Sequence, residues 1–253
     1  VEAAQSWGLE YIELHSVWGQ NICDVDSSTL SKVISIVRSS GLTVTGIDSL
    51  TLRCNLDDDQ EYDDHISHLH RSIEVARLFN TNMVRLFSFW KLDQISEEAW
   101  KKIFEKMELP IRIAEREGII LGFENVSSGN IGTSQDLEKL FTHFDSSNLQ
   151  LIWDPGNAYA AGDRSPSPEG YKRVKDRVVH VHVKDVDFEN GKRVWRPVGA
   201  GKINYHAELQ ALKNDGYNGV VALETHFRLP GDDGIQSTRQ SYDGLMSIIN
   251  ELK

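Results

Sequence analysis

The chain has 253 residues, with 27 Lys or Arg against 38 Asp or Glu, so its formal net charge is −11. A length of this order suits one α/β barrel domain spanning residues 1–253, and a hydrophobic content of 40% excludes a disordered or collagen-like chain. The acidic balance argues against general affinity for duplex DNA, and no apolar run approaches the roughly 18 residues of a membrane span.

A recurring pattern predicts the strands in chain order. Four times an amphipathic stretch ends in a glycine, which closes a helix cheaply, and a short apolar run follows. Three further apolar runs fit the series. The predicted strands are Leu9–Leu14, Leu42–Ile47, Met83–Phe89, Ile119–Phe123, Leu149–Trp153, Val178–Val183 and Val220–Leu223. Because a parallel strand needs a long crossover, a period of roughly 30 to 40 residues indicates repeated βα units.

The segments between these runs are predicted to be helices. The acidic run Asp57–Asp64 suits a helix N-terminus, where negative charge is stabilising. Segments 96–117 and 133–144 begin with Ser or Thr residues that are typical helix caps. The longest irregular stretches are expected at 160–170 and 186–202, and long loops of this kind in an enzyme usually carry function.

Seven strands are visible, whereas a (β/α)8 TIM barrel has eight. We therefore expect the first strand to lie upstream of residue 1, between the Leu9–Leu14 and Val220–Leu223 strands. The alternative, an open doubly wound sheet, lacks its glycine fingerprint, because neither Gly129–Gly132 nor Gly199–Gly201 fits a dinucleotide motif. The sequence thus predicts an α/β fold of the (β/α)8 barrel type.

Active sites of barrels form at the carboxyl ends of the strands, and nearly every predicted strand here ends in a polar residue. A lone acid or histidine at such a place is usually structural. Four ligand-type residues, however, come from four successive strands. They are Glu124, Asp154, His182 and Glu224. Mixed carboxylate and imidazole ligands suit one divalent ion, such as Mn²⁺, Mg²⁺, Co²⁺ or Zn²⁺.

The motifs around these residues resemble one known family, the xylose isomerase-like barrel superfamily. The resemblance covers about residues 1–250 and rests on four segments in the expected order. These are Leu121–Asn125, Asp154–Asn157, His180–Asp185 and Val221–Thr225. The superfamily includes sugar isomerases, ketose 3-epimerases, hydroxypyruvate isomerase, inosose and dehydroshikimate dehydratases, and endonuclease IV. The scaffold therefore hosts several chemistries.

The resemblance implies that a single divalent metal binds Glu124, Asp154, His182 and Glu224. Alternation along a strand points His180, His182 and Lys184 to one side. We expect His180 to be a buried core histidine one layer deeper. Lys184 is expected to project above the metal and contact substrate, or else to form a salt bridge with Asp185 or Glu224.

Other candidate substrate contacts lie on neighbouring strands. Arg85, Glu13 and His15 are such candidates, with packing at the barrel rim as the alternative for each. Asn157 is a further candidate, and it stands where many ketose epimerases and the endonuclease have a histidine. Because no Asp-x-His motif follows Asp185 either, the resemblance does not imply nucleic-acid cleavage.

The predicted function is that of a metal-dependent isomerase or epimerase acting on a sugar or a similar hydroxy-carbonyl compound. Glu124 and Glu224 would transfer protons on opposite faces of an enediolate. The alternative is a dehydratase on the same scaffold, and a less favoured one is a non-catalytic barrel. We expect a small sugar or polyol as partner, and neither nucleic acid nor membrane. Cys23 and Cys54 form no CxxC motif, so a cytoplasmic location is expected, while the oligomeric state, homo-oligomer included, stays open.

Overall fold

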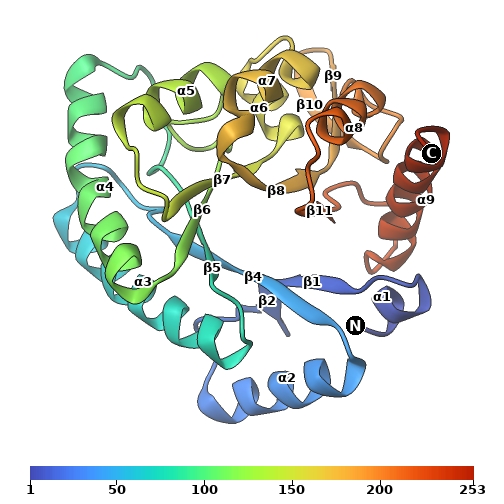
Figure 1. The fold of residues 1–253 in the computed structure, drawn as a ribbon, viewed down its shortest axis with the longest axis horizontal. Helices are drawn as coiled ribbons and strands as arrows, with labels where there is room; N and C mark the ends of the chain where they lie inside the picture. Colours follow the sequence, from blue (N-terminus) through green and yellow to red (C-terminus); the bar gives the residue numbers. More distant parts are fainter. The chain divides into compact units, whose positions relative to one another are not determined.

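A computed structural model describes residues 1–253, and the chain divides into two compact units. Unit 1 comprises Val1–Glu124 with His143–Gln150, and unit 2 comprises Asn125–Thr142 with Leu151–Lys253. Each unit combines parallel strands with helices, as the ribbon in Figure 1 shows. No helix of the chain combines the length and the apolar character needed to cross a lipid bilayer.

Four parallel strands of unit 1 lie in the order β1-β4-β5-β6. Their bounds are Tyr11–Leu14 for β1, Thr43–Thr51 for β4, Met83–Leu86 for β5 and Ile120–Glu124 for β6. Helices α1 (Glu2–Ser6), α2 (Ser27–Ser40), α3 (Asp59–Leu78) and α4 (Glu97–Glu117) lie between or before them, and β2 (Ser16–Val17) and β3 (Gln20–Asn21) form a small hairpin. Paired positions of these strands carry fully buried apolar side chains, for example Val84 of β5 opposite Leu121 of β6.

The helices of unit 1 begin and end at the residues that their sequence indicates. Asp58 accepts a hydrogen bond from the backbone N–H of Glu61, so the acidic run does start α3, as predicted. Ser96 caps α4 in the same way. At the other end of α4, Gly118 has a φ of 65°, which only glycine adopts cheaply.

Unit 2 contains a parallel arrangement in the order β7-β8-β11. Strand bounds are Leu149–Trp153 for β7, whose first two residues belong to unit 1, Val178–Val183 for β8 and Val220–Leu223 for β11. Its helices are α5 (Ser134–His143), α6 (Pro155–Ala161), α7 (Tyr171–Val174), α8 (Tyr205–Asn214) and α9 (Ile235–Glu251), with short turns at Pro166–Gly170 and Lys175–Arg177. An antiparallel hairpin of β9 (Asp185–Glu189) and β10 (Lys192–Arg196) follows β8 directly.

All seven predicted strands are present, but the two stretches expected to be irregular are partly ordered. Most of 186–202 is the β9–β10 hairpin, because Asn190 and Gly191 have φ values of 50° and 76°, as a tight hairpin turn requires. In 160–170, α6 ends at Ala161 and a turn spans Pro166–Gly170, in which the backbone of Ser167 is extended. The strand expected upstream of residue 1 stays a prediction.

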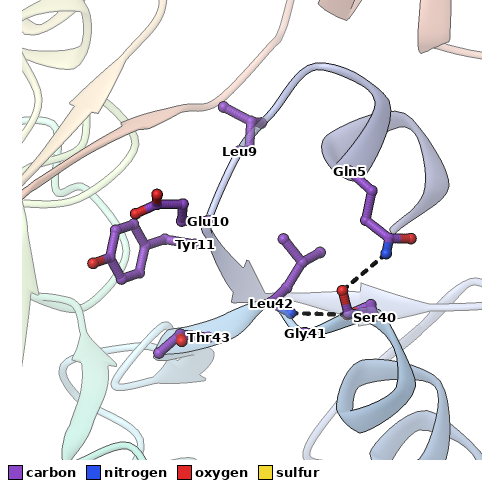
Figure 2. Close-up of a pocket in the computed structure, with 8 residues that line it drawn as sticks. All are labelled: Gln5, Leu9, Glu10, Tyr11, Ser40, Gly41, Leu42 and Thr43. Carbon is purple, nitrogen blue, oxygen red and sulfur yellow. Dashed lines mark hydrogen bonds between the residues drawn. The ribbon is translucent and has the colours of Figure 1, made fainter.

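A depression of about 470 Å³ lies at the amino-terminal ends of β1 and β4 (Figure 2). Leu9, Tyr11 and Thr43 are among the residues that line it, and Gln5 donates a hydrogen bond to the carbonyl of Ser40 beside it. Of the residues predicted to carry chemistry, Glu13 and His15 lie toward the opposite, carboxyl end of β1. The depression therefore lies away from them.

Candidate metal and substrate site

Three of the four predicted metal ligands come together within unit 2. Asp154 directly follows β7, His182 lies in β8, and Glu224 directly follows β11. Each offers a ligand atom, and these atoms lie within 4.8 Å of one another. Asp154 and His182 have no exposed surface, whereas 32% of the Glu224 side chain is exposed. The group is thus buried on one side and reachable from solvent through Glu224.

Lys184 lies between two of these carboxylates. Its ammonium is 2.8 Å from Oδ2 of Asp154 and also contacts Oε2 of Glu224. Of the two salt bridges considered from the sequence, the one with Glu224 is present. Asp185 instead accepts hydrogen bonds from backbone N–H groups of the loop that follows β10, among them those of Gly199 and Gly201.

The electrostatic surroundings of Glu224 favour its charged form. Burial acts to raise the pKa of this carboxyl, but the Lys184 ammonium and the adjacent imidazoles of His182 and His226 hold the pKa well below its usual value. Nδ1 of His182 is 3.5 Å from Oε2, and Nε2 of His226 is 3.3 Å from Oε1. The carboxylate is therefore ionised at neutral pH and surrounded by groups that stabilise negative charge.

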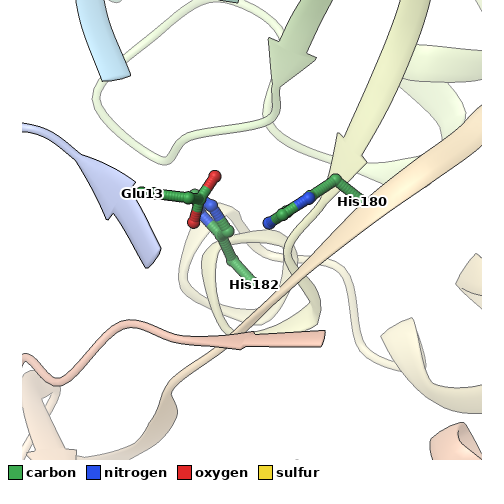
Figure 3. A group of neighbouring side chains, drawn as sticks. All are labelled: Glu13, His180 and His182. Carbon is green, nitrogen blue, oxygen red and sulfur yellow. The ribbon is translucent and has the colours of Figure 1, made fainter. Parts of the chain in front are cut away.

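The two histidines of β8 lie on one side of the strand, as alternation predicts. Figure 3 shows the side chains of His180 and His182. The two imidazole rings are 5.5 Å apart and nearly perpendicular. His180 is buried, in agreement with the deeper position expected for it.

Two further side chains hold the backbone of this group, Asn125 of the Leu121–Asn125 motif and Tyr205, which no sequence motif indicated. The hydroxyl of Tyr205 in α8 donates to the carbonyl of Lys184 and accepts from its N–H, at 2.7 and 3.0 Å. Asn125 makes a similar pair of bonds with the backbone of Asp154, at 2.9 and 3.0 Å. The carbonyl of Lys184 also lies where a side chain on Gly156 would be, 2.4 Å from a Cβ built there. Position 156 therefore requires glycine.

The buried carboxyl of Glu208 contacts the last residue of β7. Glu208 of α8 accepts a hydrogen bond of 2.7 Å from Nε1 of Trp153, the residue before Asp154. Burial raises the pKa of Glu208 to about 7, and the hydrogen bond from Trp153 offsets only part of this effect. The burial of Glu208 could have been predicted from the sequence, because Glu208 lies on the same face of α8 as the buried residues Tyr205 and Leu212.

In unit 1, Arg85 of β5 binds protein carboxylates. Its guanidinium is 2.9 Å from Oε2 of Glu124, at the end of β6, and 3.6 Å from Oδ2 of Asp48. Only 3% of the Arg85 side chain is exposed, and it lies over the ring of Phe87. Burial is tolerable for these charges because they are paired. Glu124 is therefore held by a fixed positive charge within its own unit.

The remaining predicted contacts occupy different surroundings. Glu13 is a half-buried residue of β1, and His15, just after that strand, is exposed with Nδ1 3.0 Å from the hydroxyl of Ser16. Asn157 lies buried in the first turn of α6, where its N–H donates to Oδ1 of Asp154 at 2.7 Å. Asp154 thus caps α6 with one oxygen and faces Lys184 with the other.

Comparison with known proteins identifies the family. Residues 1–245 match the family described as xylose isomerase-like TIM barrel. The chain belongs to this family and has its fold, which confirms both the resemblance and the barrel class predicted from the motifs.

Solved structures agree with this assignment. The IOLI protein, solved with a bound zinc atom, has a TM-score of 0.81 and 20% identity, covering 99% of this chain and 91% of its own. The 3-keto-D-glucoside 4-epimerase YcjR of E. coli has a TM-score of 0.74 and 18% identity, covering 96% and 91%. At these identities the likeness shows the fold alone.

A curated relative points to a second activity within the family. The inosose dehydratase of Clostridium perfringens is 24% identical over 145 residues, which are 51% of this chain and 48% of the relative. The chain spans about half the length of the curated relatives that it matches. Epimerases and dehydratases are therefore both among the proteins that this chain resembles.

Proposed function

We propose that the chain binds one divalent metal ion, of the Mn²⁺, Mg²⁺, Co²⁺ or Zn²⁺ type, through Glu124, Asp154, His182 and Glu224. The observation that carries the proposal is the convergence of the last three within unit 2, with ligand atoms within 4.8 Å. Glu124 is added because it ends β6, and barrels of this fold form their sites at the carboxyl ends of the strands.

The residues present fit such an ion. Carboxylate and imidazole groups are the donors that these metals take in proteins. The ammonium of Lys184 already lies against Asp154 and Glu224, so this position stabilises positive charge. Lys184 would have to withdraw when a divalent ion binds, and its ammonium would then be available to contact a substrate oxygen.

We infer that the reaction is removal of a proton next to a carbonyl group in a small sugar or polyol ketone or aldehyde. A bound divalent ion would supply Lewis-acid stabilisation of the charge that develops on the substrate oxygen. Glu224, ionised by its surroundings, would accept the proton on one face, and Glu124 would act on the other. Return of the proton to the opposite face gives an epimerase, and return to the neighbouring carbon gives an isomerase.

A dehydratase is the second candidate, and the inosose dehydratases among the relatives favour it. The first step is the same, because a proton next to the carbonyl is also removed before water leaves. The two candidates differ in the fate of the enediolate and therefore in the mass of the product. An isomerised or epimerised product keeps the mass of the substrate, whereas a dehydrated product is lighter by one water.

The test is proton exchange with solvent. Hydroxy ketones and hydroxy aldehydes are incubated in D₂O with the protein, with and without Mn²⁺, and deuterium at the carbon next to the carbonyl is followed by NMR. Glu124→Gln and Glu224→Gln should each reduce metal-dependent exchange by roughly 10²- to 10⁴-fold. Glu251→Gln, which changes an exposed acid of α9, should have no effect. Turnover without deuterium uptake would exclude the two-glutamate mechanism and favour a hydride shift.

A further inference from the structure

The β9–β10 hairpin begins directly after Lys184 and has two different faces. Its register pairs Phe188 with Arg193 and Val186 with Trp195. Residues directly opposite each other in an antiparallel pair project to the same side, and so do alternate residues of one strand. Val186, Phe188, Arg193 and Trp195 therefore share one face, which carries two aromatic rings and a single guanidinium group.

This face contacts the segments that carry the candidate site in unit 2. The ring of Trp195 is 4.7 Å from that of His226, which is itself 3.3 Å from Glu224. Phe188 lies 5.9 Å from the ring of Tyr159 in α6, the helix that Asp154 caps. The hairpin thus lies beside the segments that follow β7 and β11.

Arg193 also contacts the segment that follows β6, and it does so without a carboxylate partner. Its guanidinium donates a hydrogen bond of 2.8 Å to the hydroxyl of Ser127 and lies 4.8 Å from the centre of the Trp195 ring. The neighbouring cations differ, because Arg196 pairs with Glu189 and Lys202 lies 3.8 Å from Asp187. Arg193 is exposed and makes no ion pair. In a chain with a net charge of −11, this is a local positive group with donors left for a ligand.

We propose that Arg193 binds an oxyanionic group of the substrate, a carboxylate or a phosphate, and that Trp195 forms the wall against which the substrate lies. The planar guanidinium presents two parallel N–H groups that match the oxygens of either anion. Stacking on Trp195 and the bond to Ser127 hold the guanidinium in one orientation, so less freedom is lost when an anion binds. This inference rests on the proposed function, which gives the location of the reacting carbons of the substrate. It narrows the substrate class to hydroxy-carbonyl compounds that carry an acidic group.

The test compares three hydroxy ketones that share a six-carbon skeleton: fructose, fructose 6-phosphate and 5-ketogluconate. Their affinities for the protein with and without Mn²⁺ are measured by calorimetry or ligand-observed NMR. Arg193→Met should weaken binding of at least one anionic probe by roughly 10-fold and leave fructose unchanged. Arg193→Lys should restore part of the loss. Lys192→Met is the matched control, because Lys192 is an exposed cation on the other face of the same strand.

The anionic probe that responds to Arg193→Met shows whether the group is a carboxylate or a phosphate. The inference is overturned if neither anionic probe binds, if both bind Arg193→Met as tightly as the unchanged protein, or if Lys192→Met causes the same loss. These outcomes are independent of proton exchange. Arg193-dependent binding of an anionic probe without metal-dependent exchange would contradict the proposed function alone. Metal-dependent exchange together with anionic-probe binding that is unaffected by Arg193→Met would contradict this inference alone.

Discussion

Glu208 should make the folded state less stable as the pH rises, and its replacement should remove this effect. The side chain is fully buried, and burial raises its pKa from 4.5 to about 7 in the folded protein. Between these two values the folded state holds a proton that the unfolded state has lost, so stability falls with increasing pH. A difference of 2.5 pKa units at 1.36 kcal/mol each is worth about 3 kcal/mol above the folded pKa.

Glu208→Gln keeps an oxygen that can accept the hydrogen bond from Trp153 but carries no charge. Relative to the unchanged protein, its free energy of unfolding should be nearly equal at about pH 4.5 and higher by roughly 3 kcal/mol at about pH 8. Urea denaturation, followed by circular dichroism at several pH values, measures this difference. Glu251→Gln on the exposed surface of α9 is the control and should show no such trend. A stability difference that does not change with pH would mean that Glu208 titrates normally in the folded protein and that its burial does not raise the pKa.

Three further outcomes are expected at the candidate site. Lys184→Met leaves Asp154 and Glu224 without the ammonium that lies between them, so the free energy of unfolding measured in EDTA should drop by roughly 3 kcal/mol. Mn²⁺ should restore most of this loss, because the ion would take the position of the ammonium. An equal loss in the presence of Mn²⁺ would contradict the idea that the ion and the ammonium occupy the same position. Tyr205→Phe removes both hydrogen bonds to the backbone of Lys184 and should cost roughly 1–3 kcal/mol in the same denaturation assay, whereas an unchanged midpoint would show that the hydroxyl is dispensable. Asp154→Asn should leave the protein folded, as measured by circular dichroism. It should weaken metal affinity by more than roughly 10- to 100-fold, which is the usual loss when a residue that only hydrogen-bonds to a metal ligand is replaced. Unchanged metal content would show that Asp154 is not a metal ligand.

The strands were predictable because buried parallel strands leave nearly continuous apolar runs in a sequence. The bounds expected for Leu149–Trp153, Val178–Val183 and Val220–Leu223 are those observed. The β9–β10 hairpin was missed because charged residues interrupt both of its strands, so neither forms an apolar run. Its one clear signal was the dipeptide Asn190-Gly191, which is typical of a two-residue hairpin turn.

The positions of the candidate ligands followed from one rule, that chemistry gathers where barrel strands end. The side chains that contact these ligands could not be predicted in this way, because those contacts depend on the register between strands that are far apart in sequence. Lys184 and Glu224 are 40 residues apart. The sequence around Lys184 does not show that its ion pair forms with Glu224 and not with the adjacent Asp185. Arg85 was expected to contact substrate or to pack at the barrel rim, and its ion pair with Glu124 of the neighbouring strand β6 could not be read from the sequence for the same reason.

The central claim is that four side chains bind one divalent ion, and anomalous scattering from a crystal grown with Mn²⁺ tests it most directly. We expect a single strong peak bound by Glu124, Asp154, His182 and Glu224, with the ammonium of Lys184 moved away from its present contacts with Asp154 and Glu224. A crystal that binds no Mn²⁺ at these side chains, or binds it elsewhere while Lys184 keeps both contacts, would show that these side chains do not form a metal site.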